Sequence, residues 1–222
     1  MKLGVLCSGG KDSLYAAYLA KKAGHELACL ISVASENAES LMFHTPNINL
    51  IAQQAQAMNI PLIMVTTKGK KELELIDLCK AIVQAKKKYG LGGVVSGAVG
   101  SVYQSSRIQK ICNDLNITCF NPLWQKSQLE LLNELISNSF EVIIVGVFAY
   151  PLDAGWLGKK VDKAFISQMR LLEKKYGINP AGEGGEFESL VLNCPLFKKK
   201  LALVNRKISG EKYSWVMEVT LA

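Results

Sequence analysis

The sequence that decides the fold is LGVLCSGGKDSLYAAYLAKKA, residues 3–23. Five mainly apolar residues are followed by a Ser/Gly turn and then by an alanine-rich run. We therefore expect a strand over residues 2–7 and a helix over residues 13–23. A strand, a glycine turn and a helix in this order build a phosphate site, because the first N–H groups and the positive dipole end of the helix face the turn.

The side chains of residues 8–13 fit a triphosphate. Two adjacent glycines let backbone N–H groups turn toward an anion. Lys11 supplies a positive charge, and Ser8 and Ser13 supply hydroxyl donors. Asp12 would repel bare phosphate, so we expect it to bind a Mg²⁺ ion that bridges it to the triphosphate. The simpler alternative is a Ser/Gly turn that caps a helix, with Asp12 favoured near the helix start.

Composition is typical of a cytoplasmic enzyme. The 222 residues are 49% hydrophobic, which allows one domain or two small ones with a substantial core. No apolar run reaches the ~20 residues that span a bilayer, and the apolar start is too short for a secretory signal. The six cysteines occur in no Cys-x-x-Cys pair, so we expect mostly buried thiols rather than a zinc site or disulfides.

The net charge is +7, with lysine clusters at residues 68–71, 86–88 and 198–200. Such clusters attract acidic partners, but they are most often solvated faces. The chain has no arginine-rich arm or basic-aromatic repeat, so we expect no direct nucleic-acid recognition.

Strand and helix patterns alternate through the first half. We expect strands at residues 2–7, 27–33, 62–66 and 93–96, and helices at residues 13–23, 48–58, 72–89 and 101–115. This alternation predicts a doubly wound parallel sheet covered on both faces. Ligands bind beyond the carboxyl ends of such strands, so loop 8–13 should meet residues 32–35 and 96–101 there, which makes Ser32 and Gly97 candidates.

The second half changes character. After a βα-like unit at residues 118–148 and a helix at residues 161–176, strands are predicted at residues 190–192, 201–208 and 214–221. The last two are joined by a turn at residues 209–212 without a helix, so an antiparallel end is expected. We place a nucleotide-binding domain at residues 1–116 and a smaller α+β, substrate-binding domain at residues 117–222.

Three carboxylates surround a glycine pair in GEGGEFES, residues 182–189. A tight loop would make the carboxylates of Glu183, Glu186 and Glu188 converge, and converging carboxylates repel unless a cation lies between them. A metal, an ammonium ion or a cationic substrate would satisfy them. The alternative is a solvated acidic hairpin.

Two further segments carry candidates. His44 lies in SLMFHTPN, residues 40–47, after the second strand; a lone histidine is more often a hydrogen-bonded structural residue. Tyr103, Gln104 and Arg107 begin the fourth helix, where Tyr103 and Arg107 share a face one turn apart and could reach phosphate or a carboxylate.

The run SGGKDS at residue 8 resembles the pyrophosphate loop of the N-type ATP pyrophosphatases, which cleave ATP between the α and β phosphates to adenylate a substrate. Over essentially its whole length, the chain resembles the diphthine–ammonia ligase family within that superfamily. The additional motifs are MFHT at residue 42, Gly97-Ala98 with Tyr103-Gln104-x-x-Arg107, NPLW at residue 121, LDAGWLG at residue 152 and EGGEFES at residue 183.

This resemblance implies a sheet of the adenine nucleotide alpha hydrolase (HUP) type and an ATP- and Mg²⁺-dependent ligase. Such a ligase adenylates the carboxylate of diphthine on translation elongation factor 2 and transfers ammonia to it, releasing AMP and pyrophosphate. The implied partners are therefore ATP, ammonium and that elongation factor, with no membrane. The substrate carboxylate could also belong to a group other than diphthine, and the protein could form a homo-oligomer. The sequence does not identify the source of ammonia.

The candidate residues follow from the motifs and the residue types. The catalytic candidates are Lys11, Asp12 and Arg107, and Asp12 is also the metal ligand. The ATP site is expected at Ser8, Gly9, Gly10, Lys11, Asp12, Ser13, Ser32 and Gly97. The substrate site is expected at His44, Tyr103, Gln104, Trp124, Glu183, Gly184, Gly185, Glu186 and Glu188, with Trp156 as a further aromatic candidate.

Two other functions share parts of this pattern. A tRNA-modifying adenylating enzyme, of the thiolase or lysidine type, would use the same loop and is favoured by the +7 charge. A thiolase would need a reactive cysteine pair, and none is convincingly placed. A non-catalytic nucleotide-binding regulator would have no reason to keep Asp12 or the acidic loop.

Overall fold

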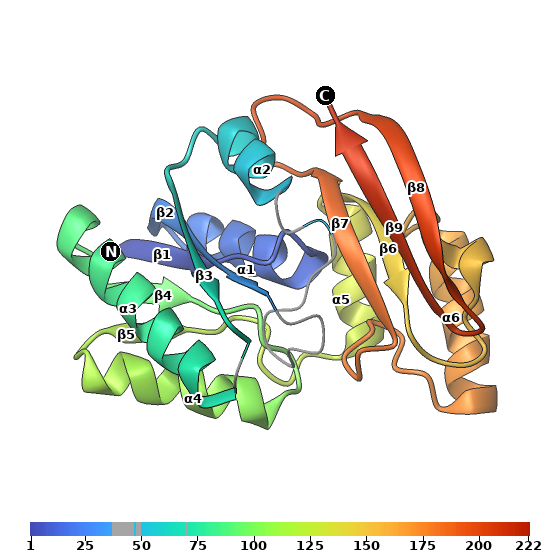
Figure 1. The fold of residues 1–222 in the computed structure, drawn as a ribbon, viewed down its shortest axis with the longest axis horizontal. Helices are drawn as coiled ribbons and strands as arrows, with labels where there is room; N and C mark the ends of the chain where they lie inside the picture. Colours follow the sequence, from blue (N-terminus) through green and yellow to red (C-terminus); the bar gives the residue numbers. More distant parts are fainter. Residues whose placement is uncertain (37–46, 48–49, 70) are drawn as a thin grey trace.

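The computed structural model describes residues 1–36, 47, 50–69 and 71–222. Its first sheet is parallel, with the strand order β3-β2-β1-β4-β5 (Figure 1). The strands are β1 (Lys2–Leu6), β2 (Glu26–Ser35), β3 (Leu62–Thr67), β4 (Gly93–Val95) and β5 (Thr118–Phe120). The helices between them are α1 (Lys11–Lys22), α2 (Ile51–Met58), α3 (Lys71–Tyr89) and α4 (Val102–Asp114). The predicted α/β alternation is confirmed.

Different helices cover the two faces of this sheet. Alternate side chains of a strand point to opposite faces, and the strands are apolar on both. Leu3 and Val5 join a core cluster with α1 and α2, whereas Ile31 and Val94 join a second cluster with α3 and α4. The sheet is therefore doubly wound, as predicted.

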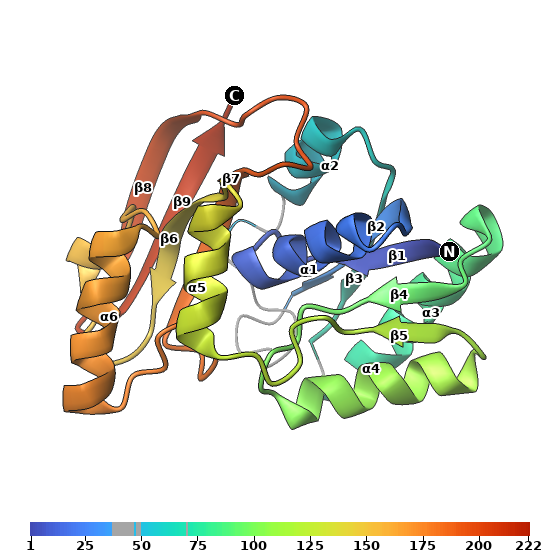
Figure 2. The same ribbon diagram turned by 180° about the vertical axis from the view of Figure 1, so that it is seen from behind.

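The second sheet is antiparallel, with the order β7-β6-β9-β8, which confirms the predicted antiparallel end (Figure 2). Its strands are β6 (Glu141–Val147), β7 (Phe187–Asn193), β8 (Leu203–Glu211) and β9 (Ser214–Leu221). The buried residues of helices α5 (Gln128–Ser137) and α6 (Lys163–Tyr176) belong to the same hydrophobic cluster as those of this sheet. A short 3₁₀ turn lies at Ala154–Trp156.

Two details differ from the sequence expectations. The predicted turn at residues 209–212 is wrong, because β8 continues to Glu211 and pairs it with Ser214, leaving Lys212 and Tyr213 as the two-residue tip. In addition, β5 pairs with β4 in the first sheet although it follows the expected boundary at residue 116. The division at that boundary stays a prediction.

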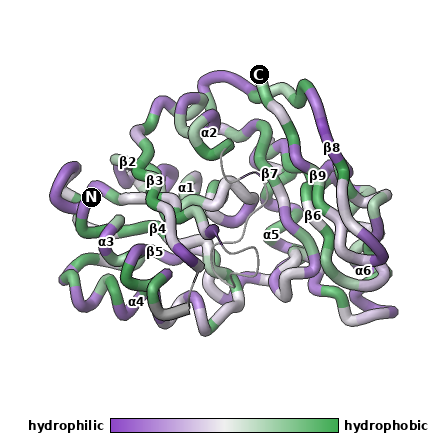
Figure 3. Tube along the Cα trace, viewed as in Figure 1, coloured by the Kyte–Doolittle hydropathy of each residue, from purple (hydrophilic) through white to green (hydrophobic). Residues whose placement is uncertain are grey.

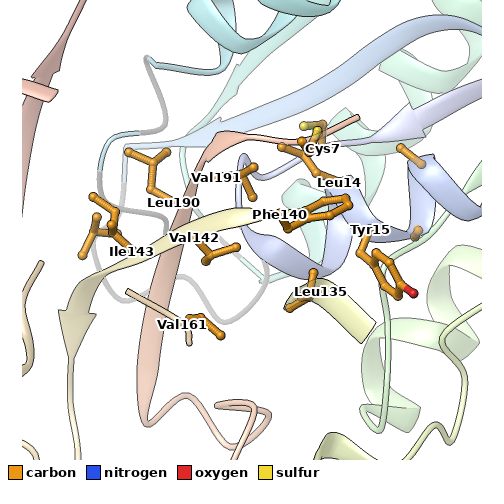
Figure 4. Close-up of a cluster of buried hydrophobic side chains, with 14 of the residues drawn as sticks. Cys7, Leu14, Tyr15, Leu135, Phe140, Val142, Ile143, Val161, Leu190 and Val191 are labelled. Atoms are coloured by element: carbon orange, nitrogen blue, oxygen red, sulfur yellow. The ribbon is translucent and has the colours of Figure 1, made fainter. Parts of the chain in front are cut away.

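One buried cluster joins the two sheets. Figure 4 shows Leu14 and Tyr15 of α1 close to Leu135 of α5 and to Phe140 and Val142 at the start of β6. Tyr15 meets the Phe140 ring edge-on at a centroid distance of 5.3 Å, and its hydroxyl donates to Glu134 at 2.8 Å. Each fully buried side chain of this size contributes about 1.5–3 kcal/mol. This packing fixes the two sheets against each other and so fixes the walls of any site between them.

Hydrophilic residues gather on the edge strand β8 and at the tip of its hairpin with β9 (Figure 3). All nine residues of β8 are exposed. Among the described helices, none combines the length and the apolar character needed to cross a membrane.

Candidate active site

A cavity of about 480 Å³ lies between the two sheets. Its walls come from the loop between β1 and α1, from the loop between β4 and α4, and from residues 182–189 before and within β7. Apolar side chains close one part of it: Leu6, Ile31, Val33, Leu78 and Ile108. The volume is within the range of small-molecule sites, and the position at the carboxyl ends of parallel strands is where such sheets bind ligands.

The loop after β1 turns into α1 two residues earlier than predicted. The helix begins at Lys11, with Gly10 as an extended N-cap residue. Gly9 has a φ of +80°, and a Cβ there would lie 2.7 Å from Oε1 of Gln54, so this position requires glycine. Ser8 and Ser13 face each other across the turn, with their hydroxyl oxygens 3.4 Å apart. Because α1 begins at Lys11, the N–H groups of its first turn belong to the motif itself.

Two buried polar side chains hold this loop in place. Neither was predicted from the sequence as a site residue. Nε2 of Gln54 in α2 donates to the carbonyl oxygens of Gly9 at 3.0 Å and of Val191 at 2.9 Å. Oγ of Ser189 in β7 accepts from the backbone N–H of Lys11 at 3.2 Å. The available signal for Gln54 was a glutamine on the buried side of a short, alanine-rich helix.

Lys11 and Asp12 form an ion pair in the wall of the cavity. Nζ of Lys11 lies 2.9 Å from Oδ2 of Asp12 and 5.4 Å from the ring centre of Phe187, and the lysine side chain is only 4% exposed. The other carboxylate oxygen of Asp12, Oδ1, is buried without a hydrogen-bond partner in the part of the chain that the structure describes. This oxygen fits a Mg²⁺ ion, which typically takes one or two protein carboxylates and completes its shell with phosphate oxygens and water.

Gly97 places the loop after β4 directly against the start of α1. A Cβ at this position would lie 2.7 Å from the backbone nitrogen of Ser13, so only glycine allows the approach. Gly97 lines the cavity, as expected. Ser32 does not line it: its neighbours Ile31 and Val33 do, whereas Ser32 is buried with a hydroxyl that has no hydrogen-bond partner.

The three carboxylates of residues 183–188 have different environments. Glu183 lines the cavity, together with Gly184 and Gly185, and accepts a hydrogen bond from the backbone N–H of Gly100 at 3.0 Å. Burial raises the pKa of Glu183, the negative charge of Asp12 raises it further, and the charge of Lys11 opposes both effects.

Glu186 turns away from the cavity into its own loop. Its carboxylate accepts from the backbone N–H and the side-chain amide of Asn179 at 3.0 and 2.6 Å, and from the N–H of Gly184 at 2.8 Å. It is not among the residues that line the cavity. In the structure Glu186 therefore acts as a structural residue that shapes the acidic loop.

Glu188 lines the cavity from the second residue of β7. Its Oε2 atom is buried without a hydrogen-bond partner in the described part of the chain. Burial raises the pKa of this carboxyl group to about 8, because the charged form is poorly solvated.

The fourth helix contributes Gln104 to the cavity, and Ser101 caps this helix by accepting from the N–H of Gln104. Tyr103 and Arg107 share a face as expected, with the guanidinium carbon 3.4 Å from the ring centre, but neither lines the cavity. The buried Nε of Arg107 donates to no atom of the residues that the structure describes.

Two aromatic candidates also lie outside the cavity wall. Trp124 is half-buried, and Trp156 packs edge-on against Phe165 and under the ammonium group of Lys159. His44 lies outside the described residues.

The cavity contains one cysteine among the described residues, Cys7. Burial raises the pKa of its thiol to about 11, which keeps it protonated and poorly nucleophilic. Among the described residues, the acidic and basic side chains that line the cavity are one cation, Lys11, and three carboxyl groups, Asp12, Glu183 and Glu188. Such a wall can bind a metal–triphosphate at one end and a cationic group at another.

The chain is similar in sequence to known proteins over most of its length. Residues 1–119 match the diphthamide synthase N-terminal domain, and residues 127–220 match the diphthamide synthase C-terminal domain. The diphthine–ammonia ligase of Bos taurus is 35% identical over 94% of this chain and 85% of its own length, and that of Homo sapiens is 34% identical over the same shares. A solved structure from Methanocaldococcus jannaschii, titled as a predicted subunit of tRNA methyltransferase, is 20% identical with a TM-score of 0.44 and covers 90% of this chain and 99% of that one.

Both domain models match in chain order, and the mammalian relatives cover nearly the whole chain at more than 30% identity. The matched segments include the Lys11–Asp12 loop and the acidic loop that together form the cavity. The chain therefore belongs to the diphthine–ammonia ligase family.

Proposed function

We propose that this protein is an ATP-dependent ligase that adenylates the carboxylate of diphthine on translation elongation factor 2 and then transfers ammonia to it. The names of its relatives support this reaction. One observation carries the proposal. Lys11 and Asp12, at the start of α1, line the same cavity as Glu183 and Glu188. A phosphate site and a cation site then lie within reach of the same substrate carboxylate.

The triphosphate of ATP would lie at the start of α1. The first-turn N–H groups, the helix dipole and Lys11 all favour negative charge there. Asp12 would hold Mg²⁺, whose charge would offset that of the phosphate oxygens. The apolar part of the cavity, formed by Ile31, Val33 and Leu78 among others, suits the adenine ring.

In the proposed reaction, the substrate carboxylate attacks the α-phosphate and pyrophosphate leaves, giving an acyl-adenylate. Ammonia then attacks the acyl carbon, and AMP leaves as the amide forms. Neither step needs a nucleophilic side chain, because nucleotidyl transfer depends mainly on positioning and charge stabilisation. A catalytic role for Arg107 stays a prediction that requires its guanidinium to leave the ring of Tyr103.

The acidic side of the cavity would receive cationic groups. Diphthine carries a trimethylated ammonium, and Glu183 offers a carboxylate beside Gly184 and Gly185. A tRNA thiolase would instead need a reactive thiol, and Cys7 with its raised pKa does not supply one. A cytoplasmic location and the absence of nucleic-acid binding stay predictions.

The test is a product assay with purified elongation factor 2 that carries diphthine, ATP and Mg²⁺, with and without ammonium. We expect AMP and pyrophosphate as nucleotide products and an amide only when ammonium is present. The same factor lacking the diphthine modification is the matched control and should release no pyrophosphate. ADP and phosphate as the products would contradict the proposed adenylation.

A further inference from the structure

Glu188 differs from the other carboxylates of the acidic loop because its buried Oε2 atom has no hydrogen-bond partner among the described residues. Glu183 accepts a hydrogen bond from Gly100, and Glu186 accepts three from its own loop. Glu188 lines the same cavity with Oε2 buried and unsatisfied. A buried carboxylate oxygen without a donor is costly, which is a reason to look for a donor that arrives with the reactants.

Glu188 lies beside a glycine that an aromatic ring covers. Glu188 pairs with Gly146 of β6, and the ring of Phe148 covers this glycine, since a Cβ at Gly146 would lie 2.8 Å from the ring and 3.5 Å from Cβ of Glu188. Burial raises the pKa of the Glu188 carboxyl group. The base of the Glu188 side chain is thus closely packed, while the residue lines the cavity.

We propose that Glu188 accepts a proton from ammonium in the cavity and so generates the ammonia that attacks the acyl-adenylate. This inference rests on the proposed function. Ammonium has no lone pair, so it cannot act as a nucleophile until one N–H bond breaks. One proton passes to the Glu188 carboxylate, and the freed nitrogen lone pair forms the C–N bond. The acyl C–O bond to AMP then breaks, and a second N–H proton leaves to the departing phosphate or to water, which gives the neutral amide.

The other carboxylates of the cavity are less suited to this step. Asp12 is paired with Lys11 at 2.9 Å, and Glu183 is engaged by the Gly100 N–H. Proton transfer from ammonium to an ordinary carboxylate is strongly uphill, whereas a base works best when its pKa is near the operating pH. The pKa of about 8 at Glu188 meets that condition.

The test separates adenylation from amide formation in Glu188→Gln. Adenylation is followed by exchange of labelled pyrophosphate into ATP in the presence of the diphthine-bearing factor. Amide formation is followed with two nucleophiles, ammonium and hydroxylamine, because hydroxylamine is largely neutral at neutral pH and needs no deprotonation before attack. Glu173→Gln, which removes an exposed carboxylate on α6, is the matched control.

We expect Glu188→Gln to exchange pyrophosphate into ATP at the wild-type rate. Its amide formation from ammonium should fall by at least ~100-fold, whereas its product formation from hydroxylamine should stay within about threefold of the wild type. Equal losses with both nucleophiles, unchanged ammonium activity, or lost exchange in Glu188→Gln would each overturn the role of Glu188. Absence of exchange in the wild type would instead refute the proposed function itself, so the two failures are distinguishable.

Discussion

The carboxylate of Glu183 accepts a hydrogen bond from the backbone N–H of Gly100 at 3.0 Å, although 83 positions separate the two residues in sequence. Gly100 belongs to the loop that follows the first sheet's β4, and Glu183 belongs to the loop that precedes the second sheet's β7. The contact therefore closes one side of the cavity by joining its two halves. It also fixes a carboxylate near Lys11 and Asp12, whose charges act on it in opposite directions.

Replacing Asp12 tests the metal–triphosphate site. We expect Asp12→Ala to reduce pyrophosphate release by at least ~100-fold, because a carboxylate that holds a metal at the reacting phosphates stabilises charge in the transition state. The fold should persist, because within the described ranges Oδ1 accepts no hydrogen bond and Oδ2 accepts from Lys11. Circular dichroism checks the fold, and Asp114→Ala, at the exposed end of α4, is the control. A folded Asp12→Ala protein with normal pyrophosphate release would contradict the assignment.

The acidic loop provides a paired comparison. Glu186→Gln should destabilise the protein by about 1–3 kcal/mol, because an amide group would face the N–H donors that the carboxylate now accepts from. Glu183→Gln should leave stability nearly unchanged but weaken binding of the cationic substrate, by ten- to hundredfold for a lost charge-assisted bond of ~1.5–3 kcal/mol.

Urea unfolding of both variants, with calorimetric titration of an ATP analogue and an amidation assay, separates the two roles. Full stability of Glu186→Gln would refute its structural role. Lost nucleotide binding in Glu183→Gln would move this residue into the ATP site.

The close approach at Gly97 predicts a steric effect. Gly97→Ala would bring a methyl group to 2.7 Å from the backbone of α1, where no flexible side chain can give way. We expect a loss of about 1–3 kcal/mol in the free energy of unfolding, together with weaker ATP binding as the start of α1 shifts. Gly92→Ala is the control, because its nearest heavy atom would be 3.6 Å away. Equal stability of the two variants in thermal unfolding would show that the loops are not in contact.

The buried carboxyl of Glu188 predicts a pH effect on stability. Its pKa is about 8 in the folded protein against an ordinary 4.5, so between these values the native state keeps a proton that the unfolded chain releases. Stability is therefore fully present below the lower value and falls as the pH rises toward the upper one.

Glu188→Gln removes this titration. Between pH 4.5 and about 8, the free energy of unfolding of the variant relative to that of the wild type should therefore rise with pH, by on the order of 1 kcal/mol per pH unit. The other titratable groups of the cavity, Lys11, Asp12 and Glu183, are the same in both proteins. Urea unfolding at several pH values measures the difference. A gap that stays constant with pH would mean that Glu188 is charged in the native state.

Local patterns were enough to predict the order of strands and helices and the antiparallel end, because apolar periodicity and turn residues act over short distances. The strand, glycine turn and helix at the start of the chain could also be predicted, since they are contiguous, whereas phosphate binding there stays a prediction. What could not be predicted depends on contacts between distant segments. Glu186 looked equivalent to Glu183 in sequence, but the position of Asn179 makes it structural. Gln54 was missed for the same reason, since its partners Gly9 and Val191 lie far from it in the chain.

The short contact between Lys11 and Asp12 means that their two charges offset each other in the wall of the cavity. Free ATP would meet a lysine whose charge is already shared with a neighbouring carboxylate, and the triphosphate would have to compete for it. A divalent ion drawn to Asp12 would release that lysine for the phosphates. Metal and nucleotide should then bind with positive thermodynamic linkage, and each should raise the affinity of the protein for the other by the same factor.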